Sequence, residues 1–224
     1  MRWEKIKINH FQLINGIQTI GVHNTNPQVG PGQSFICFSP SENVRLQYLF
    51  VCKIDDGMVW LSGAGFDRWQ IGDELVIRGP IGSGFAQPPM VKNIVFGSYG
   101  AVSGALMPLI WHGLKQQKNM TYALTYPSVE LSAELELISI QEIGDVVDWA
   151  DILYFEIKRE DIVKYNQVFQ SIRPYFEKIQ IFIHTPVLCY GQSECMICSV
   201  KTKHGYQKTC KHGSVFWLGD LEDI

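Results

Sequence analysis

The sequence predicts a chain of three parts: an N-terminal antiparallel β-barrel, a central α/β domain with a parallel sheet, and a small cysteine-rich segment. Short extended runs at close spacing fill the first 78 residues. Strands and helices alternate from about residue 91 onward, and four of the six cysteines lie in the last 36 residues. We therefore predict domains at residues 1–89, 90–187 and 188–224.

Composition excludes several classes of protein. With 224 residues the chain can bury more than one hydrophobic core. Its 46% hydrophobic residues and mean hydropathy of +0.01 exclude a disordered composition. A net charge of -3 does not provide the basic surface that nucleic-acid binding requires, so we expect no nucleic-acid partner. The start at residues 1–5 mixes both charge signs and leads into no signal segment, so we expect a cytoplasmic protein.

Five extended runs in the first part predict strands, at residues 17–23, 34–38, 47–54, 58–61 and 74–78. Many short strands separated by turn residues are typical of an antiparallel barrel or sandwich. Asp55-Asp56-Gly57 is the clearest hairpin signal among them. Glycines and prolines crowd residues 79–89, where no regular element can continue, and we place the first domain boundary there.

The second part alternates between strand and helix patterns, which indicates βα units and a parallel sheet. Predicted strands lie at residues 94–96, 121–126, 151–157 and 179–184, and predicted helices at 104–117 and 160–172. Residues 94–114 carry no charge and have the length of a membrane span. Glycines and Pro108 interrupt that stretch, so we predict a strand, a turn and a buried helix, with no membrane span.

The cysteines predict a metal site in the third part. Cys189, Cys195, Cys198 and Cys210 have the spacing C-x5-C-x2-C-x11-C, whereas Cys37 and Cys52 lie in predicted strands as buried thiols. In a reducing compartment, clustered thiols favour metal binding over disulfides. A zinc ribbon generally has two C-x2-C knuckles, and here there is one. A single loop of C-x4-C-x2-C with one distant cysteine is typical of a [2Fe-2S] cluster, which we favour over zinc or no metal.

The order of five short motifs resembles the electron-transfer subunit of class 1B dihydroorotate dehydrogenase, a relative of the ferredoxin-NADP reductases. Residues 31–33 resemble the family's P-G-Q-F motif. Residues 71–75 resemble its P-G-D-x-(V/L) motif, and residues 79–85 resemble G-P-L-G-N-G-F. Residues 195–201 and 205–216 resemble its closing C-x-x-C-V and Y-x-x-V-C-x-D-G-P-V-F. The resemblance implies a flavin-type barrel, a Rossmann-like nucleotide-binding domain and a C-terminal [2Fe-2S] domain. It also implies a catalytic flavoprotein partner with FMN in a hetero-oligomer.

The flavin-binding motifs of the family are altered in this chain. Where the family has R-P-x-S, the chain has Arg45-Leu46-Gln47-Tyr48, and its G-x-G-T has become Gly63-Ala64-Gly65-Phe66. By the resemblance, Arg45, Gly63 and Gly65 would contact FAD. The missing Ser and the Phe66 ring, which would take up space that a flavin needs, predict weak FAD binding.

The nucleotide-binding motifs of the family are altered further. Where the family has G-G-G-x-G-(V/I)-x-P, the chain has residues 97–104, with Tyr99 in the place of a glycine. The family's C-G-P motif is replaced by residues 156–160, which start with Glu156. A tight turn between strand and helix is the plainer interpretation of residues 97–104, and a nucleotide site is the alternative. We expect no efficient oxidation of NADH.

The cysteine loop has one residue more than the family's, because Tyr190 stands where an ungapped count expects the first cysteine. Either the loop absorbs the extra residue and Cys189 is a ligand, or the site has three thiols. In the second case one iron position is open, or it is filled by another ligand such as His184, His204 or His212. Four lysines follow the loop, as a solvated hairpin or as a docking face for an acidic partner: Lys201, Lys203, Lys208 and Lys211.

Three functions follow from these patterns. The first is an electron-transfer subunit with one [2Fe-2S] cluster on Cys189, Cys195, Cys198 and Cys210, working between a flavin/NAD couple and a partner oxidoreductase. The second is a complete FAD-dependent NADH reductase module. The third is a zinc-stabilised or metal-free assembly protein. The chain shows no general base, nucleophile or triad, and we predict no catalytic residue.

Overall fold

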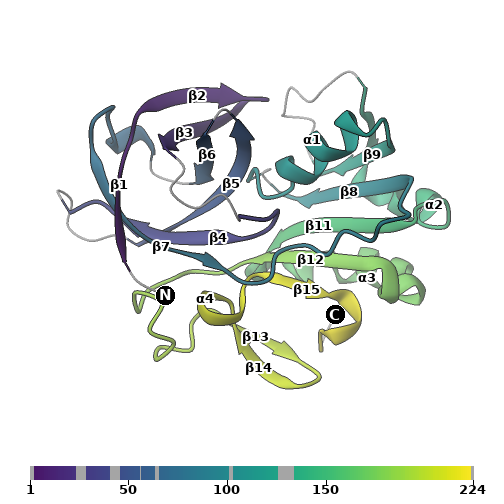
Figure 1. The fold of residues 1–224 in the computed structure, drawn as a ribbon. Coiled ribbons are helices and arrows are strands. Elements are labelled where there is room, and N and C mark those ends of the chain that lie inside the picture. The colour runs from purple at the N-terminus through teal and green to yellow at the C-terminus, as the bar shows by residue number, and fades with distance from the viewer. Residues whose placement is uncertain are drawn as a thin grey trace.

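A computed structural model describes residues 3–23, 29–40, 46–55, 57–63, 66–100, 103–125 and 134–222. Two sheets lie side by side, and a smaller C-terminal segment lies beneath them (Figure 1). In the described part of the chain no helix is long and apolar enough to cross a membrane. The uncharged stretch at residues 94–114 forms a strand, a turn and a helix, as predicted.

The first sheet has seven antiparallel strands in the order β1-β7-β4-β5-β6-β3-β2. They are β1 (Glu4–Lys7), β2 (His10–Ile14), β3 (Ile17–His23), β4 (Ser34–Phe38), β5 (Gln47–Asp55), β6 (Met58–Gly63) and β7 (Glu74–Ile81). The sheet curls around its own buried core, which includes Ile20, Leu49, Leu61 and Leu75. In the described residues no strand ladder joins β1 to β2. The antiparallel sheet that we predicted is therefore present, but it is a curled half-barrel and not a full barrel.

The second sheet has the order β10-β9-β8-β11-β12-β15. Its strands are β8 (Asn93–Tyr99), β9 (Asn119–Leu124), β10 (Glu136–Ser139), β11 (Ile152–Lys158), β12 (Ile179–His184) and β15 (Val215–Trp217). The first five are parallel, as the alternation predicted, whereas β15 pairs antiparallel with β12. Buried side chains cover both faces, which explains why these strands are continuous apolar runs.

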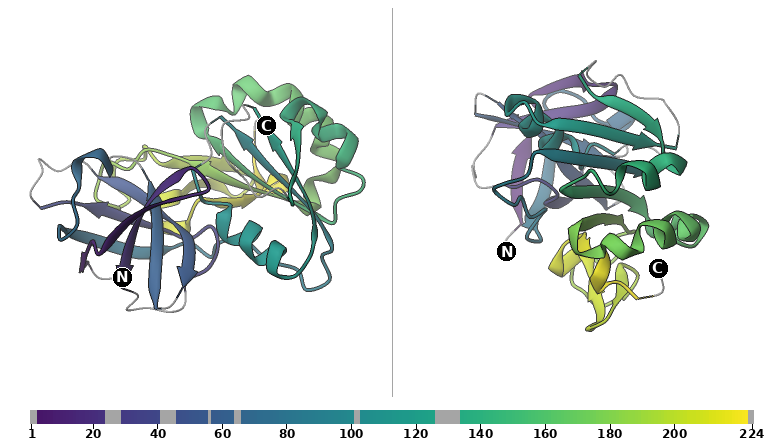
Figure 2. Two further views of the ribbon diagram at one scale, coloured as in Figure 1. Left: turned by 90° about the horizontal axis from the view of Figure 1, so that it is seen from above. Right: turned by 90° about the vertical axis from the view of Figure 1, so that its right-hand side faces the viewer.

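Helices cover both faces of the second sheet (Figure 2). On one face lies α1 (Met107–Lys115), and on the other lie α2 (Ile143–Val146) and α3 (Asn166–Ile172). The first helix begins three residues later than predicted because Gly104 has a φ of +91°, which is not helical. The second predicted helix is also shorter, since two short 3-10 turns, at Arg159–Asp161 and Val163–Tyr165, precede α3.

The C-terminal segment is short of regular structure. It contains the hairpin β13 (Ser199–Thr202) and β14 (Gly205–Lys208), followed by one helical turn, α4 (Thr209–His212). Cys198 and Cys210 are buried with Ile36 and Ile81 of the half-barrel. The core of the cysteine segment is thus shared with the first sheet. The domain boundaries at residues 89 and 187 stay predictions.

Candidate functional site

The loop after β12 carries the first three clustered cysteines. Cys189 is half-buried and Cys195 is exposed, whereas Cys198 is buried at the start of the hairpin. Tyr190 and Gly191 both have positive φ, at +49° and +70°. This left-handed backbone turns the loop back on itself directly after Cys189.

Backbone amides surround the Cys189 thiol. The N–H groups of Cys195, Glu194 and Ser193 donate to its sulfur, as does the Cys195 side chain. Burial raises the pKa of Cys189, but these hydrogen bonds outweigh it and lower the pKa to about 6. The loop is thus built to hold a thiolate at this position.

Cys198 and Cys210 form a second pair, with their sulfur atoms 3.3 Å apart. Burial raises the pKa of Cys210 to about 11, and the neighbouring Cys198 raises it too. The negative charge of Cys189 acts on Cys210 in the same direction, which shows that the two pairs are neighbours. Across the described ranges, however, no three His, Cys, Asp or Glu side chains gather closely enough to hold one metal ion. The four thiols therefore stand as two pairs and not as one cage.

Three cations hold the carbonyl groups of this loop, and sequence reasoning missed the role of all three. Arg78 Nη1 donates to the carbonyl of Gly191 at 3.1 Å, and Arg159 Nη1 to that of Ser199 at 3.0 Å. Lys208 Nζ donates to the Ser193 carbonyl. No sequence signal identifies these partners, because backbone carbonyls are equally available everywhere along a chain.

Two of the three histidines that we considered as alternative ligands have hydrogen-bond partners, and the third is exposed. His184 Nε2 lies 3.3 Å from Glu156 Oε2, and His212 Nδ1 accepts from the Lys208 amide at 3.4 Å. His204 is exposed in the turn of the hairpin. Of the four lysines, Lys201 pairs with Glu222 and Lys208 with the loop.

The structure describes only part of the expected flavin site. Gly63 ends β6, whereas Arg45 and Gly65 lie outside the described residues. The Tyr48 hydroxyl lies 3.3 Å from Thr209 Oγ1, so it faces the cysteine segment. The expectation for Phe66 was wrong: it is buried in the half-barrel core against Trp69, with ring centroids 5.4 Å apart.

A buried carboxylate lies at the turn where a nucleotide was the alternative. Glu156, 1% exposed on β11, accepts from Ser98 Oγ at 2.6 Å and from the Ser103 amide at 3.2 Å. The predicted turn over residues 97–104 begins later than expected, because Tyr99 is the last residue of β8. Its ring is buried against Phe169 of α3, with the ring centroids 5.0 Å apart. The sequence signal for Glu156 was an acidic residue inside an otherwise apolar buried strand.

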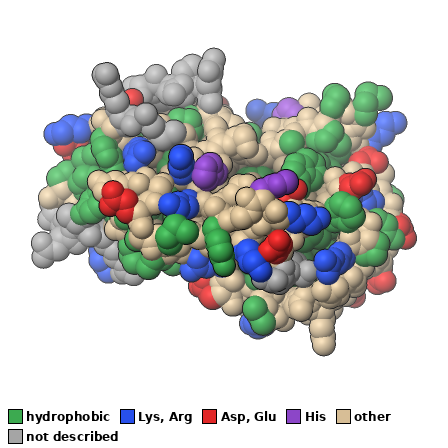
Figure 3. All heavy atoms as spheres, turned by 90° about the horizontal axis from the view of Figure 1, so that it is seen from below, with side chains coloured by type: hydrophobic (Ala, Val, Ile, Leu, Met, Phe, Trp, Pro, Cys, Tyr) green, Lys and Arg blue, Asp and Glu red, His purple; other side chains and the backbone are tan. Residues whose placement is uncertain are grey.

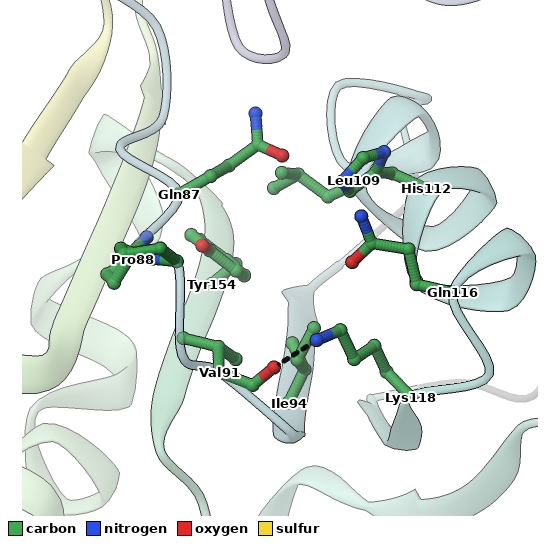
Figure 4. A pocket seen from close by; sticks show the side chains of 11 residues that line it. Gln87, Pro88, Val91, Ile94, Leu109, His112, Gln116, Lys118 and Tyr154 are labelled. Atoms are coloured by element: carbon green, nitrogen blue, oxygen red, sulfur yellow. Dashed lines mark hydrogen bonds between the residues drawn. The ribbon is translucent and has the colours of Figure 1, made fainter.

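One pocket lies apart from these groups. It measures about 510 Å³ including its open mouth, and it lies between α1 and the segment that leads into β8 (Figure 4). Gln87, Leu109 and Gln116 point toward its centre, and Lys118 Nζ bonds the Val91 carbonyl at one side. None of the predicted site residues lines it.

Comparison with solved structures defines the class of fold. The chain superimposes on the structure of an NADH-dependent reduced ferredoxin-NADP oxidoreductase, described in connection with flavin-based electron bifurcation, with a TM-score of 0.70. That match has 14% identity and covers 97% of this chain and 89% of the other. Phthalate dioxygenase reductase matches with a TM-score of 0.55 and 10% identity, covering 93% and 77%. The chain has the fold of the ferredoxin-NADP reductase-like proteins.

Among curated proteins, the chain is similar to the electron transfer subunit of dihydroorotate dehydrogenase B (NAD(+)) from Clostridium perfringens. The two are 23% identical over 95% of this chain and 94% of the relative. This confirms the resemblance predicted from the motifs. No family model matches the chain.

Proposed function

We propose that this chain is an electron-transfer subunit that holds a [2Fe-2S] cluster on Cys189, Cys195, Cys198 and Cys210. The observation that carries the proposal is the division of the four thiols into two neighbouring pairs. When bound, such a cluster stores and releases one electron at a time.

The pairs suit two metal ions better than one. Structural zinc takes four ligands around a single ion. A [2Fe-2S] cluster has two irons, and four thiolates supply two ligands to each. Cys189 with Cys195, and Cys198 with Cys210, are in this arrangement the two ligand pairs. The left-handed backbone at Tyr190 and Gly191 supports the view that the loop absorbs its extra residue.

The surroundings of the thiols favour an anionic centre. The amides that donate to Cys189 stabilise sulfur in its charged form. Arg78, Arg159 and Lys208 bring three positive charges to the carbonyl side of the loop. Fixed donors and cations near the cluster sulfurs are among the features that set its reduction potential.

The exposed side of the loop offers a route for electrons to a partner. Cys195 is exposed, and beside it Met196 and Ile197 are 46% and 36% exposed. Leu188 is 60% exposed on the same loop. On the face seen from below, hydrophobic side chains lie among both basic and acidic ones (Figure 3). By similarity to the curated relative, we propose a catalytic flavoprotein subunit as the partner in a hetero-oligomer.

The experiment is an assay of iron, acid-labile sulfide and zinc in protein purified without oxygen. We expect about two irons and two sulfides per chain and a rhombic electron paramagnetic resonance signal after reduction with dithionite. Ser variants of Cys189, Cys195, Cys198 and Cys210 should each lose the cluster. Cys37→Ser and Cys52→Ser are the matched controls, since both thiols are buried in the half-barrel and should leave the iron content unchanged.

The same measurements can also contradict the proposal. A colourless protein with one zinc per chain would contradict the cluster. Wild-type iron in Cys189→Ser would show that the fourth ligand comes from elsewhere. We also expect FAD to be lost during gel filtration, because Tyr48 replaces the family's small hydroxyl residue and bonds Thr209; stoichiometric FAD after that step would favour the reductase module.

A further inference from the structure

Glu156 lies at the place where sheets of this kind bind their ligands. In open parallel α/β sheets, ligands bind beyond the carboxyl ends of the strands, where the strand order reverses direction. Here that point lies between β8 and β11, the two central strands. Ser98 and Glu156 are paired in register on these strands, close to the carboxyl end of each.

Four groups contact the Glu156 carboxylate, and a fifth lies behind one of them. Ser98 Oγ lies 2.6 Å from Oε1, and the Ser103 amide lies 3.2 Å from Oε1 and 3.3 Å from Oε2. The Ser103 hydroxyl also donates to Oε2, and His184 Nε2 lies 3.3 Å from the same oxygen. Behind Ser98, the Tyr122 hydroxyl lies 2.6 Å from its Oγ.

The turn that holds the carboxylate leads into a helix. Ser103 and Gly104 lie in the turn that leads into α1, and turns of this kind present their amides to anionic groups of ligands. In this chain the amide of Ser103 already has an anionic partner, supplied by the next strand of the sheet. Burial raises the pKa of Glu156, but hydrogen bonds from His184, Ser103 and Ser98 lower it below its usual value. The carboxylate therefore stays charged at neutral pH.

The half-barrel holds the same turn from its other side. Ser62 Oγ donates to the Ser103 carbonyl at 2.7 Å. A Cβ atom on Gly104 would lie 2.5 Å from Ser62 Oγ, so the turn and β6 are in direct contact. Phe50 of the half-barrel packs edge-on against both Phe182 and His184, with centroids 5.2 Å apart in each case. The two sheets thus meet directly around the carboxylate.

We propose that Glu156 is an internal anion in the position that a dinucleotide phosphate would take, so that the chain itself closes this edge of the sheet to NAD(H). An incoming phosphate would have to displace a buried carboxylate of the same charge sign. The polar groups that could bind a phosphate instead join β8, β11, β12 and the turn before α1 to one another. Electrons then reach the chain from a protein or a flavin and not from a pyridine nucleotide bound here.

Isothermal titration with ADP and NADH tests this on the full chain. We expect no measurable binding of either probe to the wild type. Glu156→Ala frees the Ser103 amide and should bind ADP measurably, with a dissociation constant at least about tenfold below the lower limit that the titration sets for the wild type. A factor of ten corresponds to about 1.4 kcal/mol, and the repulsion between two like charges in contact exceeds that value. Glu160→Ala is the matched control: it removes an exposed carboxylate from the same end of β11 and should change nothing.

Glu156→Gln keeps the side chain's size and removes its charge, and it serves if the Ala variant does not fold. It should gain ADP binding to a smaller extent. Binding of NADH or ADP to the wild type would overturn the proposal, as would an equal response of the Glu156 and Glu160 variants. Iron content should stay at the wild-type value in all three variants, so failure here is distinct from failure of the cluster assignment.

Discussion

Truncation of Phe50 tests whether the two sheets touch as described. Phe50 lies on β5 and is 7% exposed, with Phe182 and His184 of β12 packed against its ring edge-on. Replacing a buried Phe with Ala costs about 3–5 kcal/mol, and edge-to-face pairs contribute about 0.5–1.5 kcal/mol each within such totals. Because Phe50 loses two such contacts, we expect Phe50→Ala to lower the free energy of unfolding by about 4 kcal/mol.

Urea unfolding followed by circular dichroism measures this change. The matched control is Phe176→Ala, because Phe176 is 40% exposed and lies in the 3-10 helix Arg173–Lys178, outside the half-barrel; its loss should cost about 1 kcal/mol. A loss below about 1 kcal/mol for Phe50→Ala, with an unchanged urea dependence, would refute the reasoning. It would mean that the two sheets do not meet at Phe50 in solution.

Three further predictions concern single side chains. The Tyr99 hydroxyl is buried and has no hydrogen-bond partner among the described residues, so Tyr99→Phe should stabilise the protein by about 1 kcal/mol in urea unfolding; a destabilised variant would contradict this. The pKa of Glu156 is lowered by folding, so its contribution to stability is complete above its unfolded pKa of about 4.3 and is lost as pH falls through the folded pKa. Stability should therefore fall more steeply below about pH 4 in the wild type than in Glu156→Gln, and equal slopes would contradict the assignment. A Cβ atom on Gly213 would lie 2.5 Å from Gly82 Cα, whereas one on Gly205 would meet nothing within 4 Å, although both have φ above +90°. Gly213→Ala should thus destabilise the chain by about 1–3 kcal/mol more than Gly205→Ala in thermal unfolding, and a similar loss in both would show that only the backbone angle matters.

The parts of the fold that sequence reasoning found are those with a strong apolar pattern. β11 and β12 were found because both faces of a parallel sheet are buried, which makes each strand a continuous apolar run. β1 and β2 were missed because they are the two edges of the half-barrel and carry mostly exposed side chains. β15 has three residues, too few for any period to be visible.

The candidate site was predictable to a similar degree. The cysteines were identified from their spacing, since thiols clustered within a short segment are rare without a shared partner. The missing C-G-P motif predicted a changed nucleotide site. It did not predict that the Glu156 carboxylate is buried and hydrogen-bonded within the protein. That contact depends on Ser103 and His184, which come from other segments of the chain. Tertiary partners of this kind leave no local pattern.

The pairing of β15 with β12 has a consequence for how the cysteine segment is anchored. Phe182 and Val215 are register partners on these adjacent strands, so the chain leaves the sheet and returns to it at neighbouring positions. Neighbouring strands are about 4.8 Å apart, which a short turn can bridge. The segment between them, which carries the four clustered cysteines, is therefore closed at its base by the second sheet. Because Cys198 and Cys210 also pack against Ile36 and Ile81 of the half-barrel, any rearrangement around these sulfurs acts on both sheets at once.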